Sequence, residues 1–234
     1  MQSRTWPEMA VVLPGTGSDA DFADRAFRRA LTQVGVATTA VEPDPRAIVA
    51  SYRDAMDRAA HEHGRIVVGG VSIGAAVALA WAADNPGRVA AVLAALPAWT
   101  GSPHDAPAAA SATFTAAQLR AHGLAAVTAQ MTASSPPWLA DELTRSWRSQ
   151  WPDLPIALEE AAGYHAPDPA TLAGIRVPVG ITAAVDDAVH PLTVAKEWAA
   201  TLPHSELTEL TLQEIGQDPG VLGQGCVAAL TRIG

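Results

Sequence analysis

The sequence is poor in cysteine and lysine, and each shortage excludes a class of protein. Its single cysteine, Cys226, cannot form a disulfide within the chain, and no cluster of cysteines and histidines is present for a zinc site. Lys196 is the only lysine, and 15 basic residues stand against 24 acidic ones, which gives a net charge of −9. No basic stripe runs along the chain, so the sequence argues against a nucleic-acid partner.

Long apolar runs are also scarce. Residues 1–8 lack the apolar centre of a signal peptide. One uncharged run of 18 residues, Ile66–Ala83, has the length of a membrane span, but its β-branched start and its Gly69-Gly70 pair favour a strand, a turn and a helix. We therefore expect a cytoplasmic protein without membrane contact, with a small molecule as its partner and with no cofactor or metal. A homodimer remains open.

The hydrophobic pattern alternates between short apolar runs and segments with helical spacing. The predicted strands are Met9–Leu13, Val36–Val41, Ile66–Gly69, Val89–Leu96, Val177–Ala183 and Glu206–Leu212. The predicted helices begin after Ser18 or Asp19, at Asp44-Pro45, at Ile73, at Pro191 and at Asp218-Pro219. Strands that alternate with helices of this length predict an α/β protein, with a mostly parallel sheet and helices on both of its faces.

The alternation stops at about Trp99 and resumes after residue 169. Between them the sequence shows only helical pieces separated by proline, glycine and serine, and the Ala-rich patch Ala106–Ala112 is predicted to be a mobile loop. We therefore predict a core made of residues 1–100 and 170–234, with residues 101–169 as a helical insertion over the sheet. Four of the seven tryptophans fall in or beside this insertion.

The strongest chemical motif is the pentapeptide from Gly70 to Gly74, with Ser72 at its centre. It is a G-x-S-x-G sequence placed between a β-branched strand and an Ala-rich helix, which is the context that a nucleophile elbow requires. The two glycines allow a tight turn, because any side chain there would collide with the neighbouring strand or helix. The motif predicts that Ser72 is a nucleophile at the carboxyl edge of the sheet.

A second glycine-rich segment follows the first predicted strand, and two interpretations compete for it. Gly15-x-Gly17-x-x-Ala20 fits a dinucleotide-binding fingerprint, with Glu42 at the end of the next strand as the ribose-binding acid. The same segment also fits a loop that donates a backbone N–H to an oxyanion near the serine. The second interpretation is favoured, because it explains both motifs together.

The third motif runs from Asp186 to Pro191, after the strand Val177–Ala183. An acid at the carboxyl end of a strand, shortly before a proline that opens a helix, is suited to orient a catalytic histidine. Either aspartate could instead cap the helix. His190 lies in the same segment.

The order of these features, an elbow serine, a helical insertion, an acid and a final strand and helix, resembles the α/β-hydrolase superfamily from about Met9 to Ile233. The resemblance implies that Ser72 is the nucleophile, that Asp187 is the acid with Asp186 as second choice, and that the backbone N–H groups of Thr16 and Ile73 form the oxyanion hole. It also implies a lid formed by the insertion, and the absence of the superfamily's two leading strands.

One position departs from the pattern of the superfamily. The catalytic histidine is expected in the loop before the last helix, at residue 217, where this sequence has glutamine. Glutamine cannot accept the proton of a serine, so the base must come from elsewhere or the site is impaired. His190 is the best substitute and His165 the second. Gln217→His is expected to raise esterase turnover by orders of magnitude.

The sequence thus predicts a serine hydrolase that acts on a small or medium apolar carboxylic ester or thioester, with an incomplete triad at Gln217. The candidate substrate-binding residues are Gly15, Trp99, Trp138 and His165. One alternative is a non-hydrolytic protein of the same fold that binds a ligand or catalyses a base-free isomerisation or cyclisation. Another, based on Gly15, Gly17 and Glu42, is a nucleotide-dependent oxidoreductase.

Overall fold

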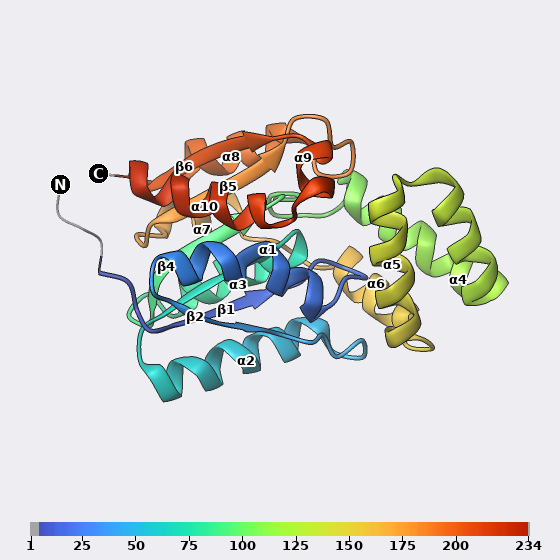
Figure 1. Ribbon diagram of the computed structural model, residues 1–234, viewed down its shortest axis with the longest axis horizontal. Helices are drawn as coiled ribbons and strands as arrows, with labels where there is room; N and C mark the ends of the chain where they lie inside the picture. Colours follow the sequence, from blue (N-terminus) through green and yellow to red (C-terminus); the bar gives the residue numbers. More distant parts are fainter. Residues whose placement is uncertain (1–4, 234) are drawn as a thin grey trace.

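A single parallel sheet organises the protein (Figure 1). The computed structural model describes residues 5–233, and their six strands follow the order β2-β1-β3-β4-β5-β6. The strands are β1 (Met9–Leu13), β2 (Ala37–Ala40), β3 (Ile66–Val71), β4 (Val89–Ala95), β5 (Val179–Ala184) and β6 (Ser205–Leu210). All five pairings are parallel, so the carboxyl ends of the strands lie at one edge of the sheet. Residues 5–8 form no strand.

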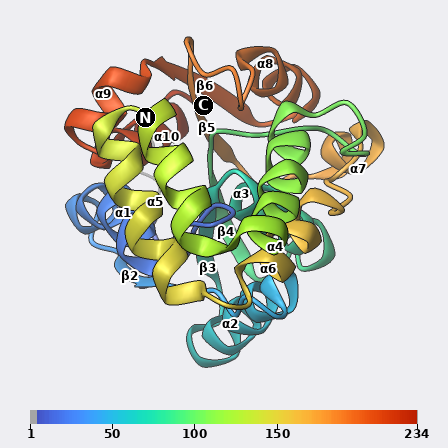
Figure 2. The ribbon, with the colours of Figure 1, turned by 90° about the vertical axis from the view of Figure 1, so that its right-hand side faces the viewer.

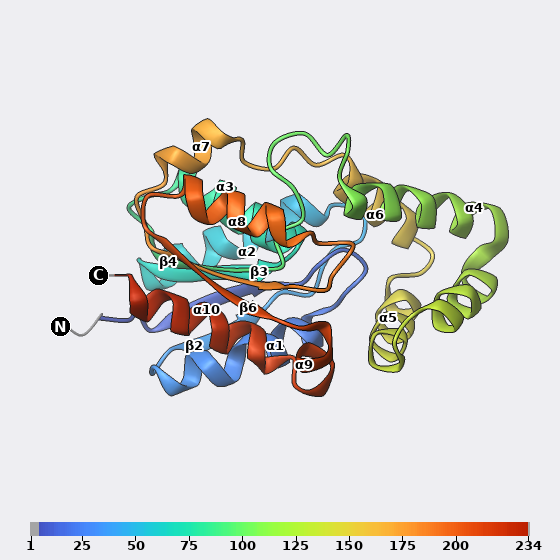
Figure 3. The same ribbon diagram turned by 90° about the horizontal axis from the view of Figure 1, so that it is seen from above.

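Helices cover both faces of the sheet (Figure 3). One face carries α1 (Ala20–Gln33) and α10 (Gly220–Arg232), and the other carries α2 (Ile48–His63), α3 (Ile73–Asp84), α7 (Pro169–Gly174) and α8 (Leu192–Thr201). Alternate residues of β1 belong to different cores: Val11 and Leu13 pack toward α2 and α3, whereas Ala10 and Val12 pack toward α1 and α10. The predicted α/β class, with helices on both faces, is confirmed.

Three helices lie together beyond the carboxyl edge of the sheet (Figure 2). They are α4 (Pro107–Ser134), α5 (Pro137–Gln150) and α6 (Leu154–Ala162), and we call them the cap. Gly123 (φ 75°) interrupts α4, so the helix folds back on itself and packs with α5 and α6 around Leu119, Trp147 and Leu158.

Three sequence predictions about local structure are wrong. Residues 107–112 of the predicted mobile loop form the first turns of α4, since Pro107 stands at its start and alanine favours helix. The helix predicted from Asp44 begins at Ile48 instead, because Asp44 closes a turn by accepting the Arg46 amide. The sequence predicts a loop before the last helix, yet this segment contains α9 (Leu212–Gln217), whose start is stabilised by a capping box of Thr211 and Glu214.

None of the helices formed by residues 5–233 combines the length of a membrane span with a sufficiently apolar sequence. The uncharged run Ile66–Ala83 is divided between β3 and α3 as predicted, but the break comes at Ser72, and both residues of the Gly69-Gly70 pair lie within β3.

Candidate active site

Ser72 stands at the turn between β3 and α3 in a conformation that L-residues rarely adopt, with φ 56° and ψ −116°. The turn is tight, because a Cβ added to Gly70 would lie 2.6 Å from the Gly74 carbonyl carbon, and one added to Gly74 would lie 2.6 Å from the Leu13 oxygen. Among the described residues one other non-glycine has positive φ, Leu96, at the end of the neighbouring β4. Backbone strain of this kind persists where packing holds a functional side chain in place.

The Ser72 hydroxyl meets an imidazole. His190 Nε2 lies 3.0 Å from Ser72 Oγ, and His190 Nδ1 lies 2.8 Å from Asp187 Oδ2. The serine comes from the elbow after β3, whereas the histidine and the aspartate both come from the loop between β5 and α8. All three side chains are largely shielded from solvent, with Ser72 7% exposed. The three residues form a continuous hydrogen-bonded chain from hydroxyl to carboxylate.

The carboxylate of Asp187 is held from several sides. Its Oδ1 accepts the backbone N–H groups of Val189 and His190, and its Oδ2 faces the ring of His190. Burial by itself raises the pKa of Asp187, but the hydrogen bond and charge of His190 and the two amides outweigh it, so that the pKa is lowered from its ordinary value of 3.8. Asp187 is therefore ionised at neutral pH and fixes the orientation of the imidazole.

Asp186 points elsewhere and has a different partner. Its Oδ1 accepts the backbone N–H of Leu212, the first residue of α9, at 2.8 Å. Of the two candidate acids, Asp187 is the one that contacts the histidine.

Two backbone N–H groups near the serine are without an acceptor among residues 5–233. Ile73 opens α3, and the first N–H groups of a helix have no partner within it. Thr16 lies in the loop after β1, where a Cβ on the preceding Gly15 would be 3.5 Å from Ser72 Cβ. The loop therefore passes directly beside the serine, and the start of α3 lies beneath it.

A cavity of about 840 Å³ extends from Ser72 to the inner side of the cap. Its lining is mainly apolar, and it includes three of the four residues expected to bind substrate, Gly15, Trp99 and Trp138. The charged residues in its wall are acidic, namely Glu142, Asp186 and Asp187, and neither lysine nor arginine lines it. His165, the fourth expected residue, is exposed and is outside the lining.

Gln217, the residue at the expected histidine position, is exposed at the last position of α9 and is not part of the cavity wall. Its neighbour Gly216 instead contacts the cap, because a Cβ there would lie 2.4 Å from Trp138 Cδ1 and Nε1. The segment that would carry the histidine is thus packed against the indole of Trp138.

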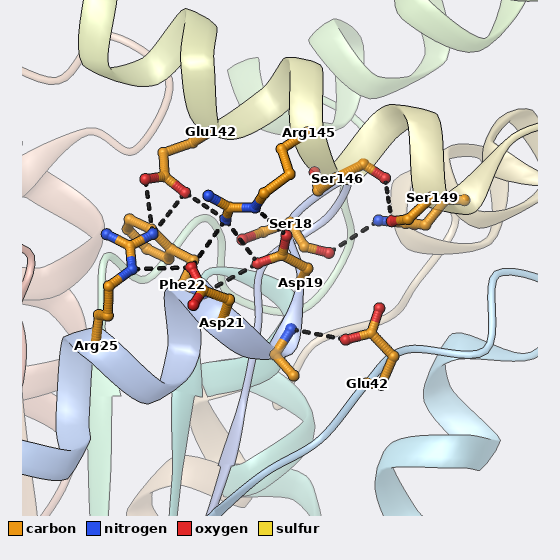
Figure 4. Close-up of polar contacts among 12 residues, drawn as sticks. Ser18, Asp19, Asp21, Phe22, Arg25, Glu42, Glu142, Arg145, Ser146 and Ser149 are labelled. Atoms are coloured by element: carbon orange, nitrogen blue, oxygen red, sulfur yellow. Dashed lines mark hydrogen bonds and ion pairs between the residues drawn. The ribbon is translucent and has the colours of Figure 1, made fainter.

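Glu42, the acid of the dinucleotide fingerprint, is engaged within the protein (Figure 4). Glu42 accepts the backbone N–H of Ala20 at 3.1 Å, and Asp19 caps α1 by accepting the N–H of Phe22. Gly17 is covered by Trp147, whose Nε1 would lie 2.8 Å from an added Cβ. The helix N-terminus that would bind a pyrophosphate is occupied by carboxylates of the chain itself.

Cys226 lies away from this cavity. It is fully buried on α10, with its sulfur 3.1 Å from Thr182 Oγ1, and burial raises the pKa of its thiol to about 12. A thiol in this state is a packing group. The residues from 5 to 233 contain no group of three or more His, Cys, Asp or Glu side chains arranged to hold a metal ion.

No protein-family model matches the sequence, and no curated protein is similar to it in sequence. Solved structures do match. A thermophilic esterase from Thermogutta terrifontis superposes with a TM-score of 0.71 at 18% identity, over 97% of this chain and 91% of the esterase. An enol-lactonase from Burkholderia xenovorans superposes with a TM-score of 0.65 at 18% identity, over 90% of this chain and 85% of the lactonase.

A third match is MGS-M2, an alpha/beta hydrolase from a Medee basin deep-sea metagenome library. It gives a TM-score of 0.68 at 16% identity, over 95% of this chain and 88% of the other. At this level of identity the similarity concerns the fold, and this chain has the α/β-hydrolase fold.

Proposed function

We propose that the protein is a serine hydrolase of small or medium apolar carboxylic esters or thioesters. Ser72 is the nucleophile, His190 is its general base, and Asp187 orients the imidazole. The observation that carries the proposal is the hydrogen-bonded chain in which His190 contacts Ser72 Oγ at 3.0 Å and Asp187 Oδ2 at 2.8 Å. A serine beside a base, with the base oriented by a third group, is the arrangement of an activated nucleophile.

The reaction follows from these positions. Ser72 Oγ attacks the carbonyl carbon while His190 Nε2 takes the hydroxyl proton, and the N–H groups of Thr16 and Ile73 stabilise the negative oxygen. His190 then gives its proton to the leaving alcohol or thiol, which departs and leaves an acyl group on Ser72. A water molecule, deprotonated by His190, attacks the acyl carbonyl, and the acid leaves as Ser72 regains its proton.

The position of His190 removes the main argument for a non-hydrolytic protein. That alternative depended on Gln217 in place of the expected histidine, and a base-free reaction would need no imidazole at Ser72. An imidazole that bonds both the hydroxyl and a buried carboxylate supports hydrolysis instead. The oxidoreductase alternative loses support as well, since Glu42 already bonds the start of α1.

The cavity supports uncharged substrates of medium size. A volume of about 840 Å³ exceeds what an acetyl group needs, and its apolar wall favours hydrocarbon on the acyl or the alcohol side. An anionic substrate would leave water for a mainly apolar wall that neither lysine nor arginine lines, which is unfavourable. The names of two structural neighbours, an esterase and an enol-lactonase, agree with a carboxylic ester bond as the target.

The test is a fluorophosphonate probe followed by a panel of esters. The probe is expected to label Ser72, and Ser72→Ala is expected to lose both labelling and hydrolysis. Within the panel, kcat/KM is expected to be at least tenfold higher for p-nitrophenyl hexanoate, which is neutral, than for the mono-p-nitrophenyl ester of glutaric acid, which is similar in length but anionic. Wild-type protein that neither accepts the probe nor hydrolyses any ester would overturn the proposal.

A further inference from the structure

The loop that follows β1 is held by the cap as well as by the core. Ser146 and Gln150, one turn apart on α5, donate side-chain hydrogen bonds to consecutive carbonyls of this loop, Ser146 Oγ to Gly17 O and Gln150 Nε2 to Ser18 O at 2.9 Å. Both donors are buried, with exposures of 2% and 4%. Buried side-chain donors on adjacent carbonyls fix the direction of both peptide groups.

An ion-pair cluster joins the same two elements beside these bonds (Figure 4). Arg145 Nε donates to Asp19 Oδ2 and Arg145 Nη2 donates to Asp19 Oδ1, both at 3.0 Å. Asp19 ends the loop and caps α1. The same guanidinium reaches Glu142 on α5, and Glu142 in turn pairs with Arg25 on α1. The hydrogen bonds to Asp19 raise the pKa of Arg145, so the guanidinium stays charged at neutral pH.

The core fixes the other end of the loop. Tyr52 donates its hydroxyl to the Pro14 carbonyl at 3.1 Å, and burial raises the pKa of this phenol, so it stays protonated as a donor. Within the loop, the Ser18 N–H donates to the Gly15 carbonyl. Because a trans peptide directs its N–H opposite to its C=O, this bond also determines where the Thr16 N–H points.

We propose that Ser146 and Gln150 are positioning residues for the oxyanion-binding N–H of Thr16, and that docking of α5 is what sets this donor beside Ser72. The inference rests on the proposed hydrolase function. It assigns to the cap a part in transition-state stabilisation in addition to its part in enclosing the substrate. An N–H donor contributes to the rate only if it meets the developing oxyanion within hydrogen-bond distance, so a small displacement of the loop acts mainly on the transition state.

The experiment compares Ser146→Ala and Gln150→Met with Ser149→Ala. Ser149 lies on the same helix and donates only to the Ser146 backbone carbonyl, so its substitution is a matched loss of one hydroxyl that leaves the loop untouched. For p-nitrophenyl hexanoate, Ser146→Ala and Gln150→Met are expected to lower kcat by about 10- to 100-fold with KM within about threefold. The affinity for a trifluoromethyl ketone inhibitor, whose adduct carries an oxyanion, is expected to fall in parallel with kcat/KM.

The outcomes separate the inference from the function on which it rests. Loss of kcat and inhibitor affinity in both variants, with Ser149→Ala like the wild type, supports the inference. Variants that hydrolyse the ester and bind the ketone as Ser149→Ala does would overturn it and leave the hydrolase function standing. A rise in KM without a loss of kcat in both variants would also overturn the inference and leave the hydrolase function standing. A wild-type protein without Ser72-dependent hydrolysis would overturn the function itself.

Discussion

Asp187 and His190 lie three residues apart on one loop, and their side chains meet with 2.8 Å between Oδ2 and Nδ1. Both side chains therefore depend on a single connection, from β5 to α8, and Asp187 also accepts two amides of that connection. The imidazole beside Ser72 therefore comes from this connection and not from the segment after β6, where the superfamily pattern would place it.

Substitution of His190 by alanine is expected to lower kcat for a neutral ester by about 10⁴- to 10⁶-fold, because the hydroxyl loses its proton acceptor. The rate at which a fluorophosphonate labels Ser72 should fall together with kcat. His165→Ala is the control, since His165 is exposed and does not line the cavity. A His190→Ala protein with more than a tenth of wild-type kcat would contradict the assignment of the base.

The substitution Gln217→His is expected to leave kcat within about twofold of the wild type. Residue 217 is exposed at the end of α9 and is not part of the cavity wall, so a new imidazole there would not reach Ser72. Kinetics on the same ester check this. A rise of several orders of magnitude, which the sequence by itself suggested, would mean that the segment after β6 supplies the base.

Asp187→Asn is expected to destabilise the protein in a pH-dependent way. The folded-state pKa of Asp187 lies below its ordinary value of 3.8, so its ionised form stabilises the fold fully above about pH 5. The contribution is lost as the pH falls below 3.8 and through the lower folded-state pKa. Urea unfolding of wild type and variant between pH 3 and pH 7 measures it, and a difference in unfolding free energy that grows toward acid would refute this sign.

Gly216→Ala is expected to destabilise the protein by about 1–3 kcal/mol, because the new methyl would overlap the Trp138 indole. Gly87→Ala is the matched control, since nothing lies within 4 Å of a Cβ at that exposed position. Urea unfolding of both variants gives the comparison. Equal stability of the two would show that Trp138 moves freely away from α9.

Much of the fold could be predicted from the sequence because its signals are local. The strand β1 coincides with its predicted range and the helix α3 begins at its predicted residue, Ile73, since an apolar run and a glycine-bounded turn are encoded by adjacent residues. The start of α2 could not be predicted. Its first two amides, at Ile48 and Val49, are capped by Glu160 from α6, more than a hundred residues away.

By itself, the sequence determined that Ser72 stands at a strained strand-to-helix turn, because only glycines at 70 and 74 leave space for the surrounding backbone. It also determined that acids and a histidine follow β5. Only the tertiary structure decided that Asp187 rather than Asp186 meets His190, and that this imidazole rather than residue 217 reaches the hydroxyl. These choices depend on how the loops of separate strands converge at one sheet edge, and a linear pattern does not contain those distances.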